Sequence, residues 1–483
     1  MSNINWNFDN SYSKLSDSFK ENIKPAKVKN PKLVILNKSL ASNLDLDFSN
    51  TSEAKLSILF AGNELPKESN SIAQAYAGHQ FGHFTMLGDG RAILIGEHLS
   101  KNKVRYDIQL KGSGKTAFSR NGDGRAALGP MLREYIISEA MHYLNILTTR
   151  SLAVVKTGEE VIREIPLAGA ILTRVASSHI RVGTFQYIAA RNKKKELETL
   201  LNYVIKRHYP SIEDSKNKAI DLLKAVLNKQ INLVINWMRV GFIHGVMNTD
   251  NMSISGETID YGPCAFMDNY DPKTVFSSID KMGRYAYCNQ PLITKWNLAR
   301  FAESLIPLIN KNQDIAIRDA TEIINSFEKK YEDQWINMMK EKLGLLGNDV
   351  KDKFLILDLL TWMHKNKVDY TNTFCHLMDE EVEKNKIYND NELLEWKKRW
   401  KERLLTNNNS TDKSIKLMRN VNPLVIPRNH KVEESLEAAN RNNFEPVKNL
   451  LKILEKPFSN QNNIHEYQLP KISEEKYQTF CGT

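Results

Sequence analysis

The sequence predicts an α+β fold in which a strand-rich half precedes a helical half. Glycine is concentrated between Gly78 and Gly183, where short strand-like runs alternate with turns. After Lys193 the apolar residues follow helical spacing, and the chain becomes richer in Lys and Asn. The 483 residues correspond to about two to four units of typical domain size. No internal repeat of solenoid period is evident.

A strand and a helix with charged residues at defined positions stand out in the first half. Apolar and polar residues alternate from Val104 to Lys111, which predicts a strand with Lys111 at its end, facing away from the apolar side. A helix is expected from Pro130, because proline is favoured in a first turn. Its acids Glu134 and Glu139 could reach a cation. Its predicted buried stripe consists of Leu132, Tyr135, Ile136 and Leu144.

The helical half begins with a long amphipathic helix. From Ala219 to Val240 the apolar residues recur at helical spacing, which predicts one buried face. The Asn-rich stretch Thr406–Lys413 predicts an exposed loop. Further helices are predicted over Leu298–Ile309, Ile315–Met339, Val350–Met363, Val432–Ala439 and Val447–Leu454.

A short segment that suits a phosphate occurs twice. Gly88-Asp89-Gly90-Arg91-Ala92 recurs as Gly122-Asp123-Gly124-Arg125-Ala126. Each copy offers flexible backbone N–H groups beside a guanidinium, although a tight turn with a solvated arginine has the same composition. Lys111–Thr116 is not a P-loop, because Gln109 stands where the motif needs glycine. A dinucleotide fingerprint at Gly122 fails as well, since no buried strand precedes it.

Two arginines close the strand-rich half. Arg174 alternates out of an apolar strand, and Arg181 follows after a turn. If both converge with Lys111, they form a strongly cationic pocket for a polyphosphate. The alternative is two unrelated surface arginines.

The segment that follows the long helix has the layout of a kinase catalytic loop. Such loops read His-Arg-Asp or His-Gly-Asp, then four residues and Asn; the Asp orients the hydroxyl nucleophile and the Asn holds magnesium. Here His244 and Asn251 are in register, but Val246 replaces the Asp. Asp250 is the carboxylate of this loop that could replace the missing base.

A small hairpin is expected next, over Met252–Gly262. It ends in Asp260-Tyr261-Gly262, the place and form of the kinase metal-binding Asp. Asn251 and Asp260 offer the oxygens that Mg²⁺ takes alongside nucleotide phosphates. Lys111 on a strand, followed by Glu134 on a helix, completes the kinase order.

The residues therefore predict a protein-kinase-like bilobal fold, with a β-rich N-lobe, a helical C-lobe and extensions at both ends. The predicted divisions are residues 1–60 for the N-terminal extension, 61–190 for the nucleotide-binding N-lobe and 191–405 for the C-lobe. The C-lobe holds the catalytic and metal loop 241–263. Residues 406–483 form the C-terminal extension with its cysteine-containing tail.

Several classes of protein are excluded or disfavoured. The formal charge of +10 is dispersed, and no zinc knuckle or aromatic-rich RNA-binding motif is present, so no nucleic-acid partner is expected. No run of apolar residues is long enough to span a membrane, and the N-terminus lacks signal-peptide features. The four cysteines form no CxxC pair, which favours a reducing cytoplasm. His79 and His83 are expected to be structural, because two nitrogens alone rarely make a zinc site.

Several longer motifs resemble those of the selenoprotein O pseudokinase family. They are Tyr76-Ala77-Gly78-His79-Gln80-Phe81-Gly82, Gln109-Leu110-Lys111-Gly112-Ser113-Gly114, Asp260-Tyr261-Gly262-Pro263, Val425-Ile426-Pro427-Arg428-Asn429-His430 and Thr479-Phe480-Cys481-Gly482-Thr483. The match covers nearly the whole chain and includes the substitution at Val246. The resemblance implies ATP bound in an inverted orientation, and transfer of AMP, in some cases UMP, to Ser, Thr or Tyr hydroxyls of proteins with release of pyrophosphate.

The resemblance also implies roles for individual residues. Lys111 and Glu134 match the family's ion pair, and Asp250 matches the proposed proton acceptor. Asn251 and Asp260 match the metal ligands, and Asp260 also counts among the nucleotide-binding residues. The remaining nucleotide-binding positions are Gly88, Gly90, Arg91, Asp123, Gly124, Arg174 and Arg181. Cys481 matches the C-terminal cysteine or selenocysteine of the family, and a regulatory disulfide there stays open.

The sequence thus predicts a monomeric, cytoplasmic protein adenylyltransferase that depends on Mg²⁺ or Mn²⁺ and acts on protein substrates. Two alternatives remain open. A catalytically silent, nucleotide-binding scaffold would explain the missing base, and a small-molecule phosphotransferase would explain His244-Gly245 but needs the Asp that Val246 has replaced.

Overall fold

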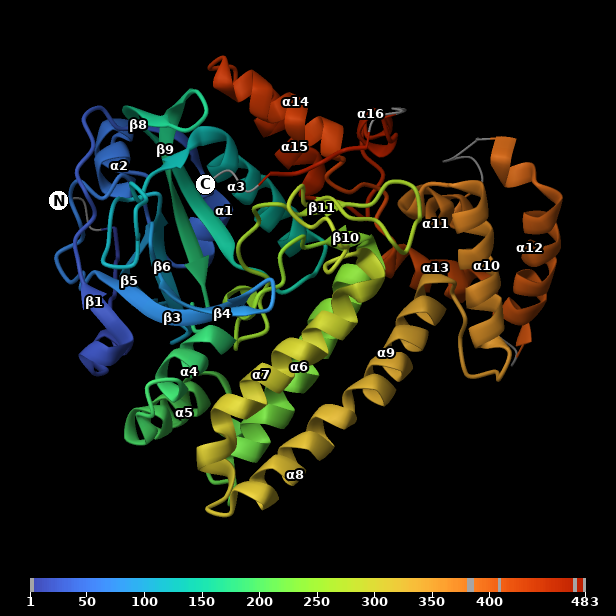
Figure 1. Cartoon of the computed structure of the whole chain (residues 1–483). Coiled ribbons are helices and arrows are strands. Elements are labelled where there is room, and N and C mark those ends of the chain that lie inside the picture. Colours follow the sequence, from blue (N-terminus) through green and yellow to red (C-terminus); the bar gives the residue numbers. More distant parts are fainter. Residues whose placement is uncertain (1–3, 380–385, 407–409, 472–475, 481–483) are drawn as a thin grey trace.

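A computed structural model of the chain describes residues 4–379, 386–406, 410–471 and 476–480. The first part of the chain contains most of the strands and the last part most of the helices (Figure 1). The predicted α+β organisation is confirmed at this level. The strands are β1 Lys20–Asn22, β2 Lys32–Leu36, β3 Ile72–Gln80, β4 His83–Gly88, β5 Ala92–Leu99, β6 Arg105–Lys111, β7 Ala126–Ala127, β8 Arg150–Ile162, β9 Pro166–Ala176, β10 Phe242–Ile243 and β11 Ala265–Phe266.

Among the described residues, nine strands form one sheet in the order β1-β3-β5-β6-β9-β8-β2, with β4 paired to β3 and β7 paired to β9. All of these pairs are antiparallel. Because β1 and β2 belong to the sheet, the N-terminal segment up to residue 60 extends it rather than standing apart. The strands β10 and β11 form a separate pair.

The helices of the sheet-containing part are α1 Lys38–Asn43, α2 Glu53–Phe60, α3 Leu128–Tyr143, α4 Val182–Ala189 and α5 Lys194–His208. Those that follow are α6 Lys218–Val240, α7 Gln290–Ile309, α8 Gln313–Asn325, α9 Phe327–Lys342, α10 Asp352–Asn366, α11 Tyr370–Met378, α12 Asn391–Leu404, α13 Thr411–Val421, α14 Asn429–Asn440, α15 Glu445–Leu454 and α16 His465–Gln468. The helices α14 and α15 return to pack on α3 (Figure 1).

The predicted strand and helix around Lys111 are confirmed, with one difference. The strand β6 is buried on both faces. Ile108 and Leu110 pack in a hydrophobic cluster, and Asp107, Gln109 and Lys111 on the other face are covered by their partners Arg207, Arg174 and Glu134. The helix α3 begins at Leu128, two residues before Pro130, and proline fits this first turn because its missing N–H has no helical partner there.

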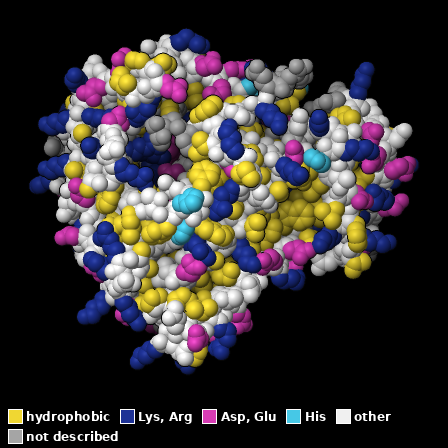
Figure 2. Space-filling model, in the orientation of Figure 1, with side chains coloured by type: hydrophobic (Ala, Val, Ile, Leu, Met, Phe, Trp, Pro, Cys, Tyr) yellow, Lys and Arg dark blue, Asp and Glu magenta, His cyan; other side chains and the backbone are white. Residues whose placement is uncertain are grey.

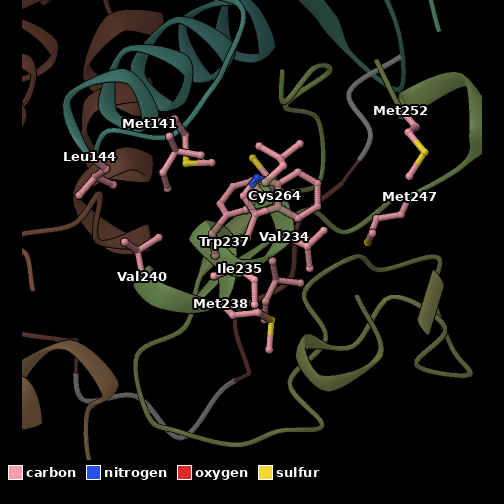
Figure 3. Close-up of a cluster of buried hydrophobic side chains, with 14 of the residues drawn as sticks. Met141, Leu144, Val234, Ile235, Trp237, Met238, Val240, Met247, Met252 and Cys264 are labelled. Carbon is pink, nitrogen blue, oxygen red and sulfur yellow. The ribbon is translucent and has the colours of Figure 1, made fainter. Parts of the chain in front are cut away.

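The long helix α6 agrees with its prediction and anchors the segment that follows it. It ends at Gly241, which has a φ of 73° and therefore suits a left-handed cap. Trp237 and Met238 of α6 lie in one buried cluster with Met247, Met252 and Cys264 (Figure 3). This packing holds the chain on both sides of residues 248–260 against the core.

Three local predictions are wrong. Ile315–Met339 is not one helix: the chain turns at Ser326, whose hydroxyl donates to the carbonyl of Ile323 (2.7 Å) and competes with the helical bond. Residues 252–262 are not a hairpin, since Ser253 bridges to Arg181 and Thr258 bridges to Thr148 instead. The loop predicted to reach Lys413 is shorter, because α13 begins at Thr411; residues 407–409 lie outside the described chain.

A buried arginine joins the C-terminal extension to the helical part. The Arg428 guanidinium donates to Asp369 (2.6 Å) and to Asp268 (2.7 Å), and it is 1% exposed. Asp369 in turn caps α11 by accepting from the Asn372 N–H (2.7 Å). In the described part of the chain, no helix is long and apolar enough to cross a membrane.

We expect Arg428→Ala to lower the free energy of unfolding by about 3–5 kcal/mol, because it leaves the buried Asp369 and the partly buried Asp268 without their cation. Arg399→Ala is the matched control: its pair with Asp358 is about half exposed, and its loss should cost less than about 1 kcal/mol. Urea unfolding followed by circular dichroism measures both. Equal losses in the two variants would contradict this role of Arg428.

Candidate active site

A cavity of about 700 Å³ lies where the sheet, α3, α14 and the segment after α6 meet. On the same face of the molecule, Figure 2 shows a hollow with Lys and Arg side chains inside it. The cavity is lined by most of the predicted site residues: Gly90, Arg91, Lys111, Glu134, Arg174, Arg181, Asp250, Asn251 and Asp260. Residues more than 100 positions apart in the sequence therefore border one cavity.

An ion pair links the sheet to α3 at the floor of this cavity. The Lys111 ammonium donates to Glu134 Oε2 at 2.6 Å, and both side chains are less than a tenth exposed. Lys111 ends β6 and Glu134 lies in the second turn of α3, so the pair fixes the helix against the strand. The other acid of α3, Glu139, binds Arg150 (2.6 Å) and does not line the cavity.

Asp260 is the point where three cations converge. Its carboxylate accepts from Lys111 (2.8 Å) and Arg174 (2.7 Å), and the Arg181 guanidinium lies at 3.4 Å. Burial alone would raise the pKa of Asp260, but these cations overcome it and hold the pKa well below its ordinary value. Asp260 is therefore ionised at all physiological pH values. Its φ of 66° is left-handed, a conformation that Asp tolerates better than most residues.

The two arginines are held by residues that the sequence alone did not single out. Gln109 Oε1 accepts from Arg174 Nε (3.1 Å) and Nη2 (2.6 Å), and Gln109 Nε2 donates to Asp89 (3.1 Å). Asp89 lies 3.7 Å from the guanidinium of Arg181, which also stacks 4.2 Å above the ring of Tyr76. Alternation on β6 and β3 could have marked Gln109 and Tyr76 as members of the cavity face, but not their partners.

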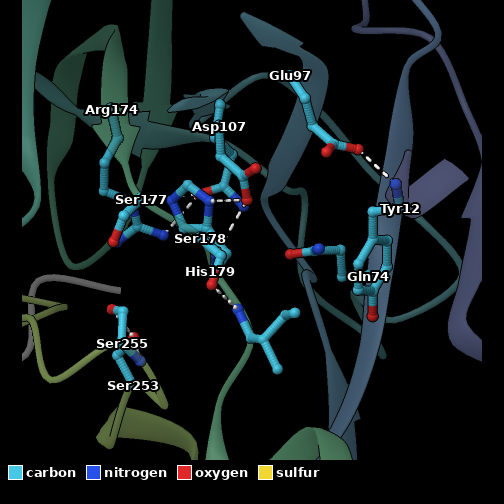
Figure 4. A network of polar contacts seen from close by, with 12 residues as sticks. Tyr12, Gln74, Glu97, Asp107, Arg174, Ser177, Ser178, His179, Ser253 and Ser255 are labelled. Atoms are coloured by element: carbon cyan, nitrogen blue, oxygen red, sulfur yellow. Dashed lines mark hydrogen bonds and ion pairs between the residues drawn. The ribbon is translucent and has the colours of Figure 1, made fainter. Parts of the chain in front are cut away.

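The turn that carries Arg181 is fixed by a buried network (Figure 4). Asp107 accepts from the backbone N–H of His179 (2.9 Å) and from its ring nitrogen Nδ1 (3.0 Å). Burial lowers the pKa of His179 to about 4, so the ring is neutral at physiological pH. The Arg207 guanidinium donates to the other oxygen of Asp107 (2.6 Å). The network sets where α4 begins, and Arg181 is its N-cap residue.

Asp250 lies beside the cationic cluster but is not neutralised by a side chain. Arg181 donates to its backbone carbonyl (3.1 Å), whereas its Oδ1 is buried without a hydrogen-bond partner among the described residues. Burial raises the pKa of Asp250 to about 6. A side chain at Gly78 would reach within 2.0 Å of Asp250 Oδ1, so glycine is needed in the strand above it.

Neighbouring residues hold the loop of Asp250 against the β3–β4 turn. The side chain of Thr249 accepts from the N–H of His79 (2.8 Å), and Asn248 Oδ1 accepts from the N–H of Phe81 (3.1 Å). His244 is buried and its Nε2 lies 2.9 Å from the carbonyl of Ile259, so it ties the loop to the segment before Asp260. Val246, which stands where the sequence pattern of a kinase loop has Asp, is apolar and buried.

Two further buried polar atoms face this region without a partner among the described residues: Arg91 Nη1 and Arg181 Nε. Unpaired guanidinium donors in a cavity point to a ligand with acceptor oxygens. Together with the unpaired Asp250 Oδ1, they indicate a site built to receive an anionic group on one side and a proton donor on the other.

Three predicted residues do not line the cavity. Asp123 binds Arg163 at the surface (2.9 Å), Gly124 packs against the backbone of Gly114, and Gly88 packs against Phe118. Nucleotide contact at these three positions stays a prediction. Cys481 lies outside the described residues.

The histidine pair that the sequence suggested to be structural is separated by the turn of the β3–β4 hairpin. His79 Nδ1 lies 3.0 Å from Gln186 Nε2, and its ring packs on Trp296, whereas His83 is exposed. Within the described residues, no group of three or more His, Cys, Asp or Glu side chains could hold a metal ion.

Comparison with known proteins indicates the class. A protein of Pelagibacter ubique (strain HTCC1062) named Protein nucleotidyltransferase YdiU is 64% identical over 481 residues, which cover 99% of this chain and 100% of that protein. Proteins of the same name from Nitrosococcus oceani and Halalkalibacterium halodurans are each 55% identical, over 99% of this chain and 98% of theirs. The class is therefore that of the nucleotidyltransferases.

A family model described as Protein adenylyltransferase SelO matches residues 2–455. The chain belongs to the SelO family, as the motifs of its sequence imply.

The pKa values of Asp250 and Asp260 are shifted in opposite directions, so replacing each residue by Asn should change stability in opposite directions. The raised pKa of Asp250 means that its ionisation in the fold opposes folding: stability falls as pH rises from about 4 to about 6. A rise in pKa from 3.8 to about 6 corresponds to about 3 kcal/mol. Asp250→Asn should therefore match the parent near pH 4 and exceed it in stability above pH 6.

Asp260→Asn is the counterpart. Its lowered pKa contributes stability that is present above the unfolded pKa and lost in acid, so this variant should be less stable than the parent at pH 8. Thermal unfolding between pH 4 and pH 8 measures both variants. A shift in the same direction for both would contradict the charge assignment.

Proposed function

We propose that this protein transfers AMP from ATP to Ser, Thr or Tyr hydroxyls of proteins and releases pyrophosphate. The observation that carries the proposal is the buried cluster of Lys111, Arg174 and Arg181 around Glu134 and Asp260 in one cavity. Such a concentration of cations suits a triphosphate. The names of the relatives, which describe transfer of nucleotides to proteins, agree with it.

We propose further that the fold is that of a kinase-like, bilobal pseudokinase. The support is the order of its parts: a strand lysine, a helix glutamate, a loop with His244 and Asn251 after a long helix, and then Asp260. The lobes would comprise residues 61–190 and 191–405, with residues 1–60 and 406–483 as extensions.

The distribution of charge in the cavity supports an inverted orientation of ATP. Arg91, Lys111, Arg174 and Arg181 all line the cavity, and three of them are at most 6% exposed. They would bind the β- and γ-phosphates and stabilise the leaving pyrophosphate. This leaves the α-phosphate towards Asp250, which borders the same cavity.

In the transfer step, the hydroxyl oxygen of the acceptor attacks the α-phosphorus. The new O–P bond forms as the bond between the α-phosphorus and the bridging oxygen breaks, and pyrophosphate takes the electron pair. Asp250 accepts the hydroxyl proton at a carboxylate oxygen. Its pKa of about 6 makes it a stronger base than an ordinary Asp, while it is still mostly ionised near pH 7. The aliphatic side chain of Val246 has no acceptor for that proton.

A divalent ion, Mg²⁺ or Mn²⁺, fits the donor set. Asn251 and Asp260 line one cavity and offer an amide and a carboxylate oxygen, and such ions take their remaining ligands from phosphates and water. These two residues would hold the ion, which would supply positive charge to the phosphate oxygens.

UTP as a second donor, a cytoplasmic location and a monomeric state belong to the same proposal; the low cysteine content favours the location.

Labelled ATP tests the reaction. After incubation with a cell lysate, we expect label to enter protein from α-labelled ATP and not from γ-labelled ATP, because the α-phosphate is the group transferred. Label from the γ-phosphate alone would indicate a kinase instead. Tight ATP binding without any transfer would indicate a nucleotide-binding scaffold.

The catalytic roles predict a pH profile. Transfer should increase as pH rises through about 6, because Asp250 must be ionised to accept the proton. Asp250→Asn should lower the rate by about a hundredfold or more and remove this rise. Asp260→Ala should abolish metal-dependent transfer. Full activity of the Asp260→Ala variant would contradict the proposal that Asp260 binds the metal and the phosphates.

A further inference from the structure

The strand β4 presents a free edge beside the cavity. Among the described residues β4 pairs with β3 alone, so its other edge is open. The β3–β4 turn consists of Phe81 (φ 51°) and Gly82 (φ 92°), both left-handed, as in a two-residue hairpin turn. Hydrogen bonding alternates along an antiparallel pair, and Gln80 and His83 close the turn. The backbone groups of Phe84 and Met86 therefore face the open edge.

This edge lacks the usual protection against other strands. Edge strands are normally blocked by charged residues, proline or a bulge. The sequence of β4 is His-Phe-Thr-Met-Leu-Gly, with no Lys, Arg, Asp, Glu or Pro. Phe84 is 44% exposed and Met86 is 43% exposed. Hydrophobic side chains gather over the β3–β4 hairpin in Figure 2. An open, apolar, uncharged edge favours addition of an extended chain.

A second feature, a pocket of about 500 Å³, adjoins the turn of the hairpin. It is lined by Phe81 of the turn, by Ile279 and Met282 of the loop before α7, and by Leu292 of α7. Ile279, Met282 and Leu292 are more than half exposed, so the pocket offers apolar surface to a partner.

Hydrogen bonds connect this pocket to the site of the chemistry. Asn248 Oδ1 accepts from the N–H of Phe81 (3.1 Å) and from the hydroxyl of Tyr285 (2.7 Å), and the two rings lie 5.3 Å apart. Asn248 stands two residues before Asp250. A segment held in the pocket and on the edge is thus held at a fixed position relative to Asp250.

The charge of the pocket indicates an acidic partner. Lys281 and Arg284 line it. Arg284 Nε is buried without a hydrogen-bond partner among the described residues, and the guanidinium lies 4.9 Å above the ring of Trp296. The one acid of the lining, Asp280, accepts from the backbone N–H groups of Arg284 (2.9 Å) and Tyr285 (2.7 Å), so its charge is already engaged.

We propose that the acceptor protein binds as an extended segment that adds to the free edge of β4 and places an acidic residue near Lys281 and Arg284. This inference rests on the proposed transfer to protein hydroxyls. Side chains alternate between the faces of an added strand. The hydroxyl residue would share the face of Tyr76 and Gln80, which line the cavity, and its two neighbours would pack on Phe84 and Met86. The preferred acceptor therefore has apolar residues on both sides of the hydroxyl residue.

A positional-scanning library of short peptides with a fixed central Ser, Thr or Tyr, labelled from α-labelled ATP, tests the proposal. We expect apolar residues next to the hydroxyl residue, and acidic rather than basic residues at the end near the turn, to raise labelling about tenfold. Methylation of peptide nitrogens that face β4 should lower the labelling of the best peptide. A flat profile, or equal labelling of the methylated peptide, would overturn the proposal.

Variants of the surface give a second test. Phe84→Asp and Met282→Asp should each lower labelling of the best peptide about tenfold and leave the affinity for ATP unchanged. Phe354→Asp, on the distant helix α10 and 68% exposed in the parent, is the matched control and should change neither. Unchanged peptide labelling in both surface variants would overturn the proposal.

The failure of the inference and of the proposed function are distinguishable. Labelling of lysate proteins without labelling of any peptide overturns the docking of an extended segment and leaves the transfer reaction intact. If α-labelled ATP labels neither lysate proteins nor peptides, the proposed transfer reaction is wrong, and the inference fails with it.

Discussion

The active cavity depends on one constraint: three buried cations share two carboxylates. Lys111, Arg174 and Arg181 surround Asp260, and the first two also bind Glu134. Each charge is buried at a cost that only its partners offset. The sheet, α3 and the segment after α6 each supply one or more members, so these parts cannot separate without exposing an unpaired charge to a low dielectric. A bound polyphosphate would meet cationic side chains that are already held in place by these ion pairs.

The same electrostatics shift the pKa values of the two aspartates in opposite directions. Asp260 lies among the cations and stays ionised, whereas Asp250 lies at their margin, where burial outweighs the attraction of Arg181 and raises its pKa. Two carboxylates with different pKa values are typical of sites in which one carboxylate stabilises charge and the other transfers a proton. Under the proposed function Asp250 would have the second task, because Val246 stands where kinase loops have their base.

The C-terminal extension braces the cavity from the outside. Arg133 of α3 donates to the carbonyl of Cys264 (2.8 Å) and to Glu433 of α14 (2.7 Å). The hydroxyl of Thr479 donates to the carbonyl of Pro263 (2.7 Å). Both contacts hold the chain directly after Asp260. The β3–β4 hairpin also borders the cavity, through Tyr76 and Gln80, and its strand β4 pairs with β3 alone in the part of the chain that the structure describes.

The sequence by itself determined the parts of the site whose signals are local. Lys111 at the end of an alternating strand, Glu134 on a helix, and the spacing from His244 to Asn251 and Asp260 are short patterns, and the structure brings these residues into one cavity. Helices such as α6, α14 and α15 were equally evident, because their periodicity is a local property.

Only the tertiary structure decided which residues hold the arginines. Gln109 contacts Arg174 from 65 residues away, and no spacing rule reports a contact across strands. The hairpin predicted after Met252 is wrong for the same reason. Its two expected strands bridge instead to Arg181 and Thr148, which are distant in the sequence. The free edge of β4 is also a property of the whole sheet. Strand pairing, burial and charge neutralisation depend on contacts between residues that are far apart in the sequence. Periodicity and motif spacing depend only on neighbouring residues, so the sequence alone reveals them.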